Sequence, residues 1–463
     1  MASLENHGAA LEDQLVPGLN FKIGPGSNYV LERKNVSFYP QGSNIYSTSN
    51  GQRVLRISLN SDQAWGDPST GFLFFRCNNR DTTAQTASAI TRVEPLGMGH
   101  VFFKSGRLLL NGQVAEQIDD LGRAYELLSR LSPETAQKQY AAMSFGLQKP
   151  YPEDSADLRS VCRIPPGKSK TIAMPLGLFG IWGQHRFLPF SACNMVLELT
   201  LQDPALCCRG GTSTSGSVTT TFTQTNVDLD MFVLKMDTLV LDSQLQEEYN
   251  RMLLTKTLPI SYKTWHHTSY AQTGNSSEVS VAFQRSVSRL CTVFVTFFST
   301  SATPSVNQEC NYFPHVEGQI DSIIPPDADH PLFTTDVTDD SKAVQWEFVC
   351  DGTRYPSSPC LTTVEAYTAL VRALGFAGQT SHSIAIGGKA YETTDFCICE
   401  NFEKVIGSAL SGKNLRGGSQ LLLHLKNMVH PGMIETDKIT KIFLLCQFDA
   451  IAELSAQGVT ILE

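Results

Sequence analysis

The stretch closest to a known chemical motif is GSALSGKN, residues 407–414, which matches the G-x-x-x-x-G-K of a phosphate-binding loop. In such a loop a Ser or Thr hydroxyl after the lysine coordinates Mg²⁺, but here that position is Asn414. The surroundings also differ, because the run GSQLLLHLKN after the motif has the pattern of a strand where a helix should begin. A structural turn is therefore the preferred interpretation.

The cysteines and histidines are not spaced as metal ligands. Cys397 and Cys399 would lie on the same side of a strand, and two further cysteines are adjacent at positions 207 and 208. The chain has no C-x-x-C pair, and His266 and His267 lack the H-x-H arrangement of a cupin metal site. We expect neither a metal nor another cofactor.

Two carboxylates could form an acid pair that binds or cleaves a glycan. Asp62 and Asp67 flank Trp65 in NSDQAWGDPST, as an acid pair beside an aromatic sugar platform would. The run DPS is also a common turn, in which an aspartate accepts hydrogen bonds from the following amides, and this explanation is preferred. The sequence contains no G-x-S-x-G, and His185 has no evident Ser or Asp partner. An enzyme is therefore not expected, and a glycan-binding or glycan-cleaving protein using Asp62 and Asp67 stays the alternative.

Composition limits the class of protein. At 463 residues the chain exceeds the usual size of one hydrophobic core, so two domains are expected. The net charge of −9 argues against a protein that grips nucleic acid along a broad surface, and we expect no sequence-specific nucleic-acid binding. The N-terminal residues lack the apolar stretch of a secretory signal, which predicts synthesis in the cytoplasm and mostly reduced cysteines.

Strand patterns dominate the chain. Residues 52–60, QRVLRISLN, alternate apolar and polar side chains, and runs such as CTVFVTFFS, NMVLELTLQD and DMFVLKMDTLVLD are short and rich in Val, Leu, Phe and Thr. Helical periodicity is clearest in residues 118–131, where it extends toward Phe145, and in residues 243–254 and 362–374. This distribution predicts an all-β fold with a few short helices in the connections.

A repeat relates the two halves of the chain. The segments AYELLSR and AYTALVR, each within a predicted helix, pair Ala124 with Ala366, Tyr125 with Tyr367, Leu128 with Leu370 and Arg130 with Arg372. Before each helix we expect a strand that ends in glycine, at Gly112 and Gly352, and after each helix a glycine turn and another strand. Duplication is the economical interpretation. Each half has room for about eight strands, which suits a jelly roll.

The domain boundaries follow from this repeat. We predict an N-terminal arm at residues 1–19, a first jelly roll at 20–241, a linker helix at 242–254 and a second jelly roll at 255–463.

Four stretches spread over most of the chain carry a family resemblance: residues 32–79, residues 175–190, residues 344–375, and residues 400–427 together with 439–454. They resemble the major capsid proteins of small eukaryotic double-stranded DNA viruses and transposons, the group of polinton-like viruses, adintoviruses and virophages.

The resemblance implies a double jelly roll and a structural, non-enzymatic role. Three chains would form a pseudo-hexameric capsomer, a homotrimer, and capsomers would tile an icosahedral shell around a double-stranded DNA genome. Further partners would be neighbouring capsomers, penton proteins and minor or cement proteins, with an internal membrane beneath the shell as one possibility. The protein would be made in the host cytoplasm and reside in the virion capsid.

The segment PLGLFGIWGQHRFLPFS, residues 175–191, combines apolar side chains with three glycines. It is too short to cross a bilayer and too rich in glycine for a buried helix. We expect a corner leading into the last strands of the first jelly roll, with Phe179, Ile181 and Trp182 packed between domains or chains and His185 and Arg186 at the rim. A core position within one domain is the alternative for Trp182.

Overall fold

The computed structural model of the 463-residue chain describes residues 29–48, 52–60, 65–81, 90–131, 164–184, 186–190, 192–214, 217–219, 226–272, 276–283, 285–299, 309–314, 344–375, 386, 391, 395–405, 410–416, 419–428, 439–455 and 458–463.

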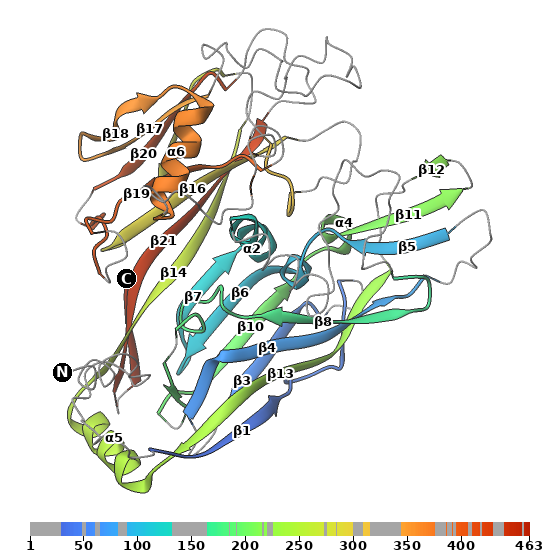
Figure 1. The fold of residues 1–463 in the computed structure, drawn as a ribbon. Coiled ribbons are helices and arrows are strands. Elements are labelled where there is room, and N and C mark those ends of the chain that lie inside the picture. The colour runs from blue at the N-terminus through green and yellow to red at the C-terminus, as the bar shows by residue number, and fades with distance from the viewer. Residues whose placement is uncertain are drawn as a thin grey trace, which may run out of the picture. The chain divides into compact units, whose positions relative to one another are not determined.

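The two larger sheets in the first half of the chain are antiparallel (Figure 1). The strands of the first sheet, in spatial order, are β1 (Val30–Phe38), β13 (Val227–Leu241), β4 (Trp65–Asn79) and β8 (Ser169–Pro175). The second has the order β3 (Val54–Leu59), β10 (Met195–Leu201), β6 (Phe103–Leu110) and β7 (Gln113–Asp119). Two short strands extend the first sheet, β2 (Ile45–Tyr46) beside β13 and β9 (Leu188–Pro189) beside β4.

A third, three-stranded sheet in the same half contains β12 (Ser217–Thr219), β11 (Cys208–Thr214) and β5 (Ile90–Pro95). It connects to short helical elements, η1 (Gly99–Phe102) and α4 (Pro204–Cys207).

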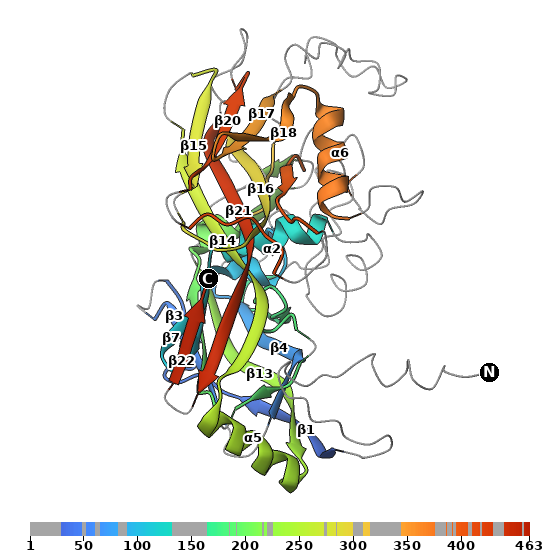
Figure 2. The same cartoon turned by 90° about the vertical axis from the view of Figure 1, so that its left-hand side faces the viewer.

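The second half repeats the arrangement of the two larger sheets. One sheet has the order β14 (Leu258–Ala271), β21 (Ile439–Ser455), β16 (Leu290–Ser299) and β19 (Ile398–Asn401), with β22 (Gly458–Leu462) paired to β21. The other, visible in Figure 2, has the order β15 (Val279–Phe283), β20 (Leu421–Lys426), β17 (Gln345–Cys350) and β18 (Thr353–Cys360).

The strand orders are the same in both halves. When the eight principal strands of each half are numbered along the chain, both halves pair them as 1-8-3-6 and 2-7-4-5. Two four-stranded antiparallel sheets with this connectivity form an eight-stranded jelly roll. The chain is therefore an all-β protein with two tandem jelly rolls, which confirms the predicted fold class.

The predicted helices are present at nearly the predicted residues. They are α2 (Leu121–Arg130), α5 (Ser243–Thr255) and α6 (Thr363–Ala373). α6 begins with a capping box in which Thr362 and Glu365 satisfy each other's backbone N–H groups. The N-cap residue of α5 is Asp242, whose side chain accepts from the Gln244 backbone N–H. The predicted extension of the first helix beyond residue 131 lies outside the described residues.

One detail of the predicted repeat needs correction. Gly112 and Gly352 do not separate a strand from a helix, because each stands in a two-residue hairpin turn followed by a further strand, β7 or β18. Asn111 and Gly112 have φ of 48° and 82°, and Asp351 and Gly352 have φ of 52° and 75°. Two positive φ angles in succession suit the right-handed twist of a hairpin. The repeated unit is therefore hairpin and helix.

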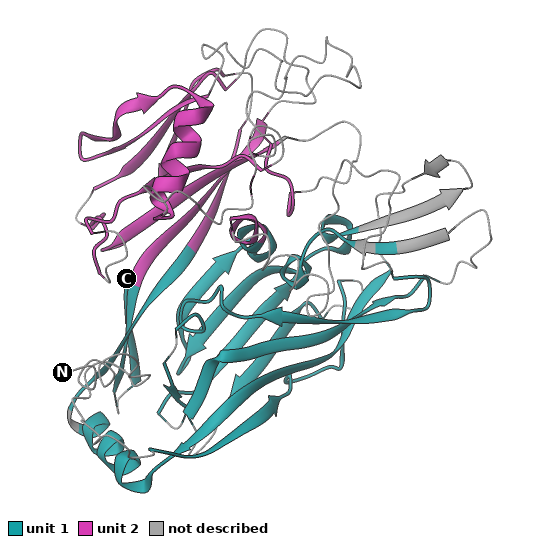
Figure 3. Ribbon diagram, viewed as in Figure 1, with its two compact units in different colours: residues 1–125, 138–265, 450–463 teal, residues 126–137, 266–449 magenta. Residues whose placement is uncertain are grey.

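The backbone also separates into two compact units (Figure 3). Unit 1 comprises Met1–Tyr125, Lys138–Trp265 and Ala450–Glu463, and unit 2 comprises Glu126–Gln137 and His266–Asp449. The helix α2 and the strands β14 and β21 thus contribute residues to both. The boundaries predicted from the repeat, at residues 241 and 255, stay an interpretation of the sequence.

Alternating burial shows why the strands form. In β3 the side chains of Leu55, Ile57 and Leu59 are fully buried, while the residues between them are more exposed. All eleven cysteines in the described part of the chain are free and buried, as small apolar residues would be. No helix among the described residues is long and apolar enough to cross a membrane.

Candidate functional site

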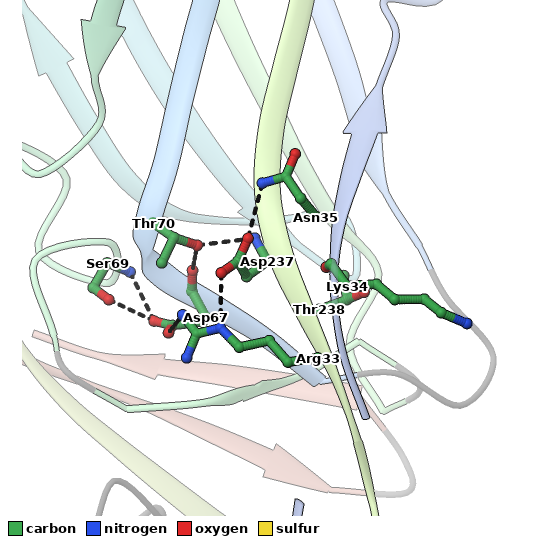
Figure 4. Close-up of polar contacts among 8 residues, drawn as sticks. All are labelled: Arg33, Lys34, Asn35, Asp67, Ser69, Thr70, Asp237 and Thr238. Carbon is green, nitrogen blue, oxygen red and sulfur yellow. Dashed lines mark hydrogen bonds and ion pairs between the residues drawn. The ribbon is translucent and has the colours of Figure 1, made fainter. Parts of the chain in front are cut away.

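Asp67, one member of the predicted carboxylate pair, lies on β4 inside a network of hydrogen bonds (Figure 4). One carboxylate oxygen accepts from the Ser69 backbone N–H at 3.2 Å and from the Ser69 hydroxyl at 2.6 Å. The other forms an ion pair with the Arg33 guanidinium of β1 at 2.8 Å. The turn predicted for this aspartate is therefore present.

The network lies at a β-bulge in the sheet. Between the paired residues Asp67–Asp237 and Phe72–Lys235, β4 has four intervening residues and β13 has one. The Thr70 hydroxyl spans this bulge, because it accepts from the Asp237 backbone N–H at 2.9 Å and donates to the Asp67 carbonyl at 2.8 Å. The Asp237 N–H and the Asp67 carbonyl are therefore hydrogen-bonded to a side chain at the bulge, where the pairing between the two strands is interrupted.

Asp237 completes the network with its own carboxylate, which accepts from the Asn35 amide at 2.8 Å and from Arg33 at 2.7 Å. The Asn35 hydrogen bond and the Arg33 guanidinium lower the pKa of Asp237, against a smaller raising by burial. The bond to Asp237 and the charge of Asp67 raise the pKa of Arg33. These charges hold β1, β4 and β13 together.

This arrangement does not resemble a pair of catalytic acids. A general acid or base needs a free oxygen directed at substrate, whereas both oxygens of Asp67 are bonded within the sheet and the residue is 5% exposed. The Trp65 indole is also buried and donates to the Gln246 side chain of α5 at 2.7 Å, so it offers no platform for a sugar. Asp62 lies outside the described residues.

The second region of interest is the turn between β8 and β9, residues 176–187, named here the aromatic turn. Phe179, Ile181 and Trp182 are 1%, 0% and 2% exposed within the single chain. Arg186 is half-buried, and His185 lies outside the described residues. All of these positions fall in unit 1, and their role in assembly stays a prediction.

Glycines in the sheets of unit 1 make room for the rings. A Cβ on Gly106 of β6 would lie 2.6 Å from the Phe179 ring, and one on Gly71 of β4 would lie 2.6 Å from the Trp182 indole nitrogen. The ring of Phe190, just after the aromatic turn, occupies the space over Gly66 in the same way. These rings belong to the packed interior, where such contacts tolerate little change in volume.

Backbone packing fixes the aromatic turn at its centre. A Cβ on Gly180 would lie 1.7 Å from the Lys263 carbonyl oxygen of β14, so only glycine allows this approach. The Gly180 and Ile181 backbone N–H groups donate to the two carboxylate oxygens of Glu116 on β7, at 2.7 and 2.8 Å. Sequence reasoning missed Glu116, although an acid among the apolar residues of VAEQI was a detectable signal.

The arginines of the repeat form ion pairs in unit 2. Arg130, at the end of α2, is buried against Asp395, donates to the Asn311 carbonyl and lies 4.4 Å from the centre of the Phe313 ring. Arg372, its equivalent in α6, pairs with Glu400 of β19 at 3.3 Å. These two ion pairs thus attach the last turn of each helix to other segments of unit 2.

The weaker motifs have structural explanations. Gly412, in the loop that resembles a phosphate-binding site, packs against the backbone of Arg289 and Leu290, and Lys413 forms an isolated bridge with Leu290. No helix begins there among residues 410–416, and residues 407–409 lie outside the described part. Within the described ranges, no group of three or more His, Cys, Asp or Glu side chains could hold a metal ion.

Comparison with known proteins identifies the fold. The chain matches no family model and no curated protein. Among solved structures it is similar to a chain of the PBCV-1 virus capsid, with a TM-score of 0.55, 11% identity and coverage of 95% of this chain and 98% of that one. A chain of the Sputnik virophage gives 0.55 and 10%, covering 98% and 92%, and the Faustovirus major capsid protein gives 0.56 and 8%, covering 94% and 93%. At these identities the likeness establishes a common fold, the double jelly roll of viral major capsid proteins.

Proposed function

We propose that this chain is the major capsid protein of a double-stranded DNA virus or related element, with no enzymatic activity of its own. The observation that supports it most is the fold: two jelly rolls of identical strand order match viral capsid chains over more than nine-tenths of both partners. The role would be shape and self-association, located in the virion shell.

The assembly we infer is a homotrimer. Two similar jelly rolls per chain give three chains six similar units, and a ring of six can approximate the hexagonal symmetry of a tiled shell. Obligate interfaces of this kind bury about 2,000 Å² or more and are rich in apolar groups. Neighbouring capsomers, penton proteins and minor or cement proteins are the proposed further partners, with an internal membrane as one possible layer beneath.

The aromatic turn belongs to this proposal as a packing element. Phe179, Ile181 and Trp182 would hold the shape of the subunit on which assembly depends, and His185 and Arg186 would lie near its rim. The burial of Phe179, Ile181 and Trp182 within a single chain supports a role in subunit shape over direct contact with a partner chain.

The test is the mass and outline of the purified chain. Light scattering coupled to size exclusion should give three times the chain mass of 50.8 kDa, and negative-stain images should have a hexagonal outline. A stable monomer at micromolar concentration would count against the proposal.

The alternative, a glycan-acting protein, has its own test. If that alternative were correct, a D62N/D67N double variant would lose binding in a glycan screen that the unmodified chain passes. Glycan binding that is lost in this variant, while the variant keeps the thermal stability of the unmodified chain, would favour the glycan-acting role over the capsid role.

A further inference from the structure

Glu116 joins three segments that are distant in the sequence. It lies on β7 and is 2% exposed. Its carboxylate accepts from the Gly180 and Ile181 backbone N–H groups of the aromatic turn and, at 2.9 Å, from the Thr264 hydroxyl of β14. All of these residues belong to unit 1. One side chain therefore connects β7, the aromatic turn and the first half of β14.

Within the described ranges, no cationic side chain forms an ion pair with this carboxylate. Within unit 1, the other titratable and charged side chains on β7 and on the elements around it are Asp119 on β7, Lys104 and Arg107 on β6, Tyr262 and Lys263 on β14, Arg186 in the aromatic turn and Glu463 after β22. Among the described residues none of them forms an ion pair with Glu116 or a hydrogen bond to its carboxylate; the Tyr262 hydroxyl instead donates to the Ala115 carbonyl at 2.9 Å. An ionised Glu116 is thus held by hydrogen bonds alone, in an environment where an unpaired charge is costly.

The three donors allow the carboxyl group to be neutral as well. Two of them are backbone N–H groups, which can only donate, but the Thr264 hydroxyl can donate or accept. When the carboxyl oxygen nearest Thr264 carries a proton, its O–H can therefore donate a hydrogen bond to that hydroxyl, while the hydrogen bonds from Gly180 and Ile181 persist. Only the hydroxyl of Thr264 has to reorient.

Burial and the three hydrogen bonds act in opposite directions on Glu116, and together they favour its neutral form up to about pH 7. Burial raises the pKa of Glu116 to about 7, which outweighs the lowering by the hydrogen bonds from Ile181, Gly180 and Thr264. The ordinary value is 4.5.

We propose that Glu116 is a proton-dependent clasp, whose neutral carboxyl group holds the aromatic turn and the first half of β14 to β7, and whose ionisation loosens both. The clasp is a property of the single chain, so it does not depend on the proposed capsid role.

The direction of the pH dependence follows from the two protonation states. In the closed state the aromatic turn and β14 are bound to Glu116, and in the open state Glu116 is exposed to water. An acid whose pKa is higher in the closed state than in the open state takes up a proton on closing. Closure is strongest below pH 4.5, weakens as the pH rises to about 7, and is constant above that because both states are then ionised. Within this window the opening equilibrium constant should rise up to about tenfold per pH unit, and about 300-fold in all.

A local measurement is needed because a second buried group has the opposite effect. Burial lowers the pKa of His100 to about 3, from 6.5, against a smaller raising by its hydrogen bond to the Pro175 carbonyl. That group favours the folded state increasingly as the pH rises from about 3 to 6.5, so global unfolding would combine the two trends.

The experiment is hydrogen–deuterium exchange of the intact chain between pH 5 and 8.5, read in peptides that contain the Gly180 and Ile181 amides. After correction for the intrinsic exchange rate, protection should fall with rising pH and level off above about pH 7. E116Q should remove this dependence. E198Q is the matched control, since Glu198 on β10 has arginine partners, Arg56 and Arg107, and should leave the profile unchanged. Peptides from β17 in unit 2 serve as an internal reference.

Flat protection of the aromatic turn in the unmodified chain would overturn the proposal, as would an unchanged slope in E116Q. If E116Q does not fold, the unmodified chain decides alone. A fall confined to the aromatic turn and β14 supports the clasp, and an equal fall in the β17 peptides overturns it.

Discussion

Replacing Gly180 with alanine should lower the free energy of unfolding by about 3 to 5 kcal/mol. The added Cβ would lie 1.7 Å from the Lys263 carbonyl oxygen and 2.7 Å from its carbonyl carbon. Both are backbone atoms of β14, so no side-chain rotation can relieve the overlap. Overpacking of this kind costs about 1–3 kcal/mol. Displacing the turn would also weaken the hydrogen bond from Gly180 to Glu116, and bonds to charged groups contribute about 1.5–3 kcal/mol.

The assay is urea unfolding followed by tryptophan fluorescence at pH 8, where Glu116 is ionised. Gly177→Ala is the matched control, since Gly177 is in the same turn and an added Cβ there has no atom within 4 Å. The control should change stability by no more than about 0.5 kcal/mol. Equal midpoints for the two variants would refute the close packing of the aromatic turn on β14.

Three other substitutions test separate parts of the structure. Trp182→Ala should cost about 3–5 kcal/mol and give misassembled or monomeric protein, measured by thermal unfolding and light scattering; a normally stable, normally assembled variant would contradict its packing role. Asp395→Ala should cost about 3–5 kcal/mol in urea unfolding because it removes the carboxylate that balances the charge of the buried Arg130 guanidinium. The exposed pair of Glu32 and Lys34 supplies its control, since Glu32→Gln should cost less than about 1 kcal/mol, and similar losses for both would contradict the reasoning. His100→Gln should reduce the loss of stability between pH 6.5 and 4, because the lowered pKa of His100 makes the folded chain resist protonation there; unfolding midpoints that follow the same pH profile with and without His100 would rule this out.

The fold was largely readable from the sequence because local patterns encode it. Alternation in residues 52–60 gives β3, in which Leu55, Ile57 and Leu59 are buried, and the periodic segments give α2, α5 and α6. The hairpins after β6 and β17 were missed, although Asn111–Gly112 and Asp351–Gly352 are strong hairpin signals. Each glycine was interpreted as the end of a strand, so β7 and β18 were not predicted.

The site was less accessible because its contacts join distant segments. The DPS turn at Asp67 could be predicted from its neighbours, but its ion pair with Arg33 depends on strand pairing through β13, which no local pattern specifies. The hydrogen bonds of Glu116 join it to Gly180, which is 64 residues away in the sequence, and to Thr264, which is 148 residues away. A buried acid on a strand reveals itself in sequence only as a break in the apolar pattern, and its partners cannot be read from that break.

The burial of the cysteines gives the chain a practical use as a labelling scaffold. Thiol reagents attack the thiolate, and burial raises the pKa of Cys193 and Cys360 to about 12, which keeps both thiols protonated and shielded. A cysteine introduced at Val364 or Leu254, which are 73% and 76% exposed, should therefore react with a maleimide dye far faster than the buried thiols. With Cys162, which lies outside the described residues, replaced by serine, a fluorophore or cross-linker could be attached at one chosen point. Energy transfer between chains labelled in this way would follow self-association as it happens.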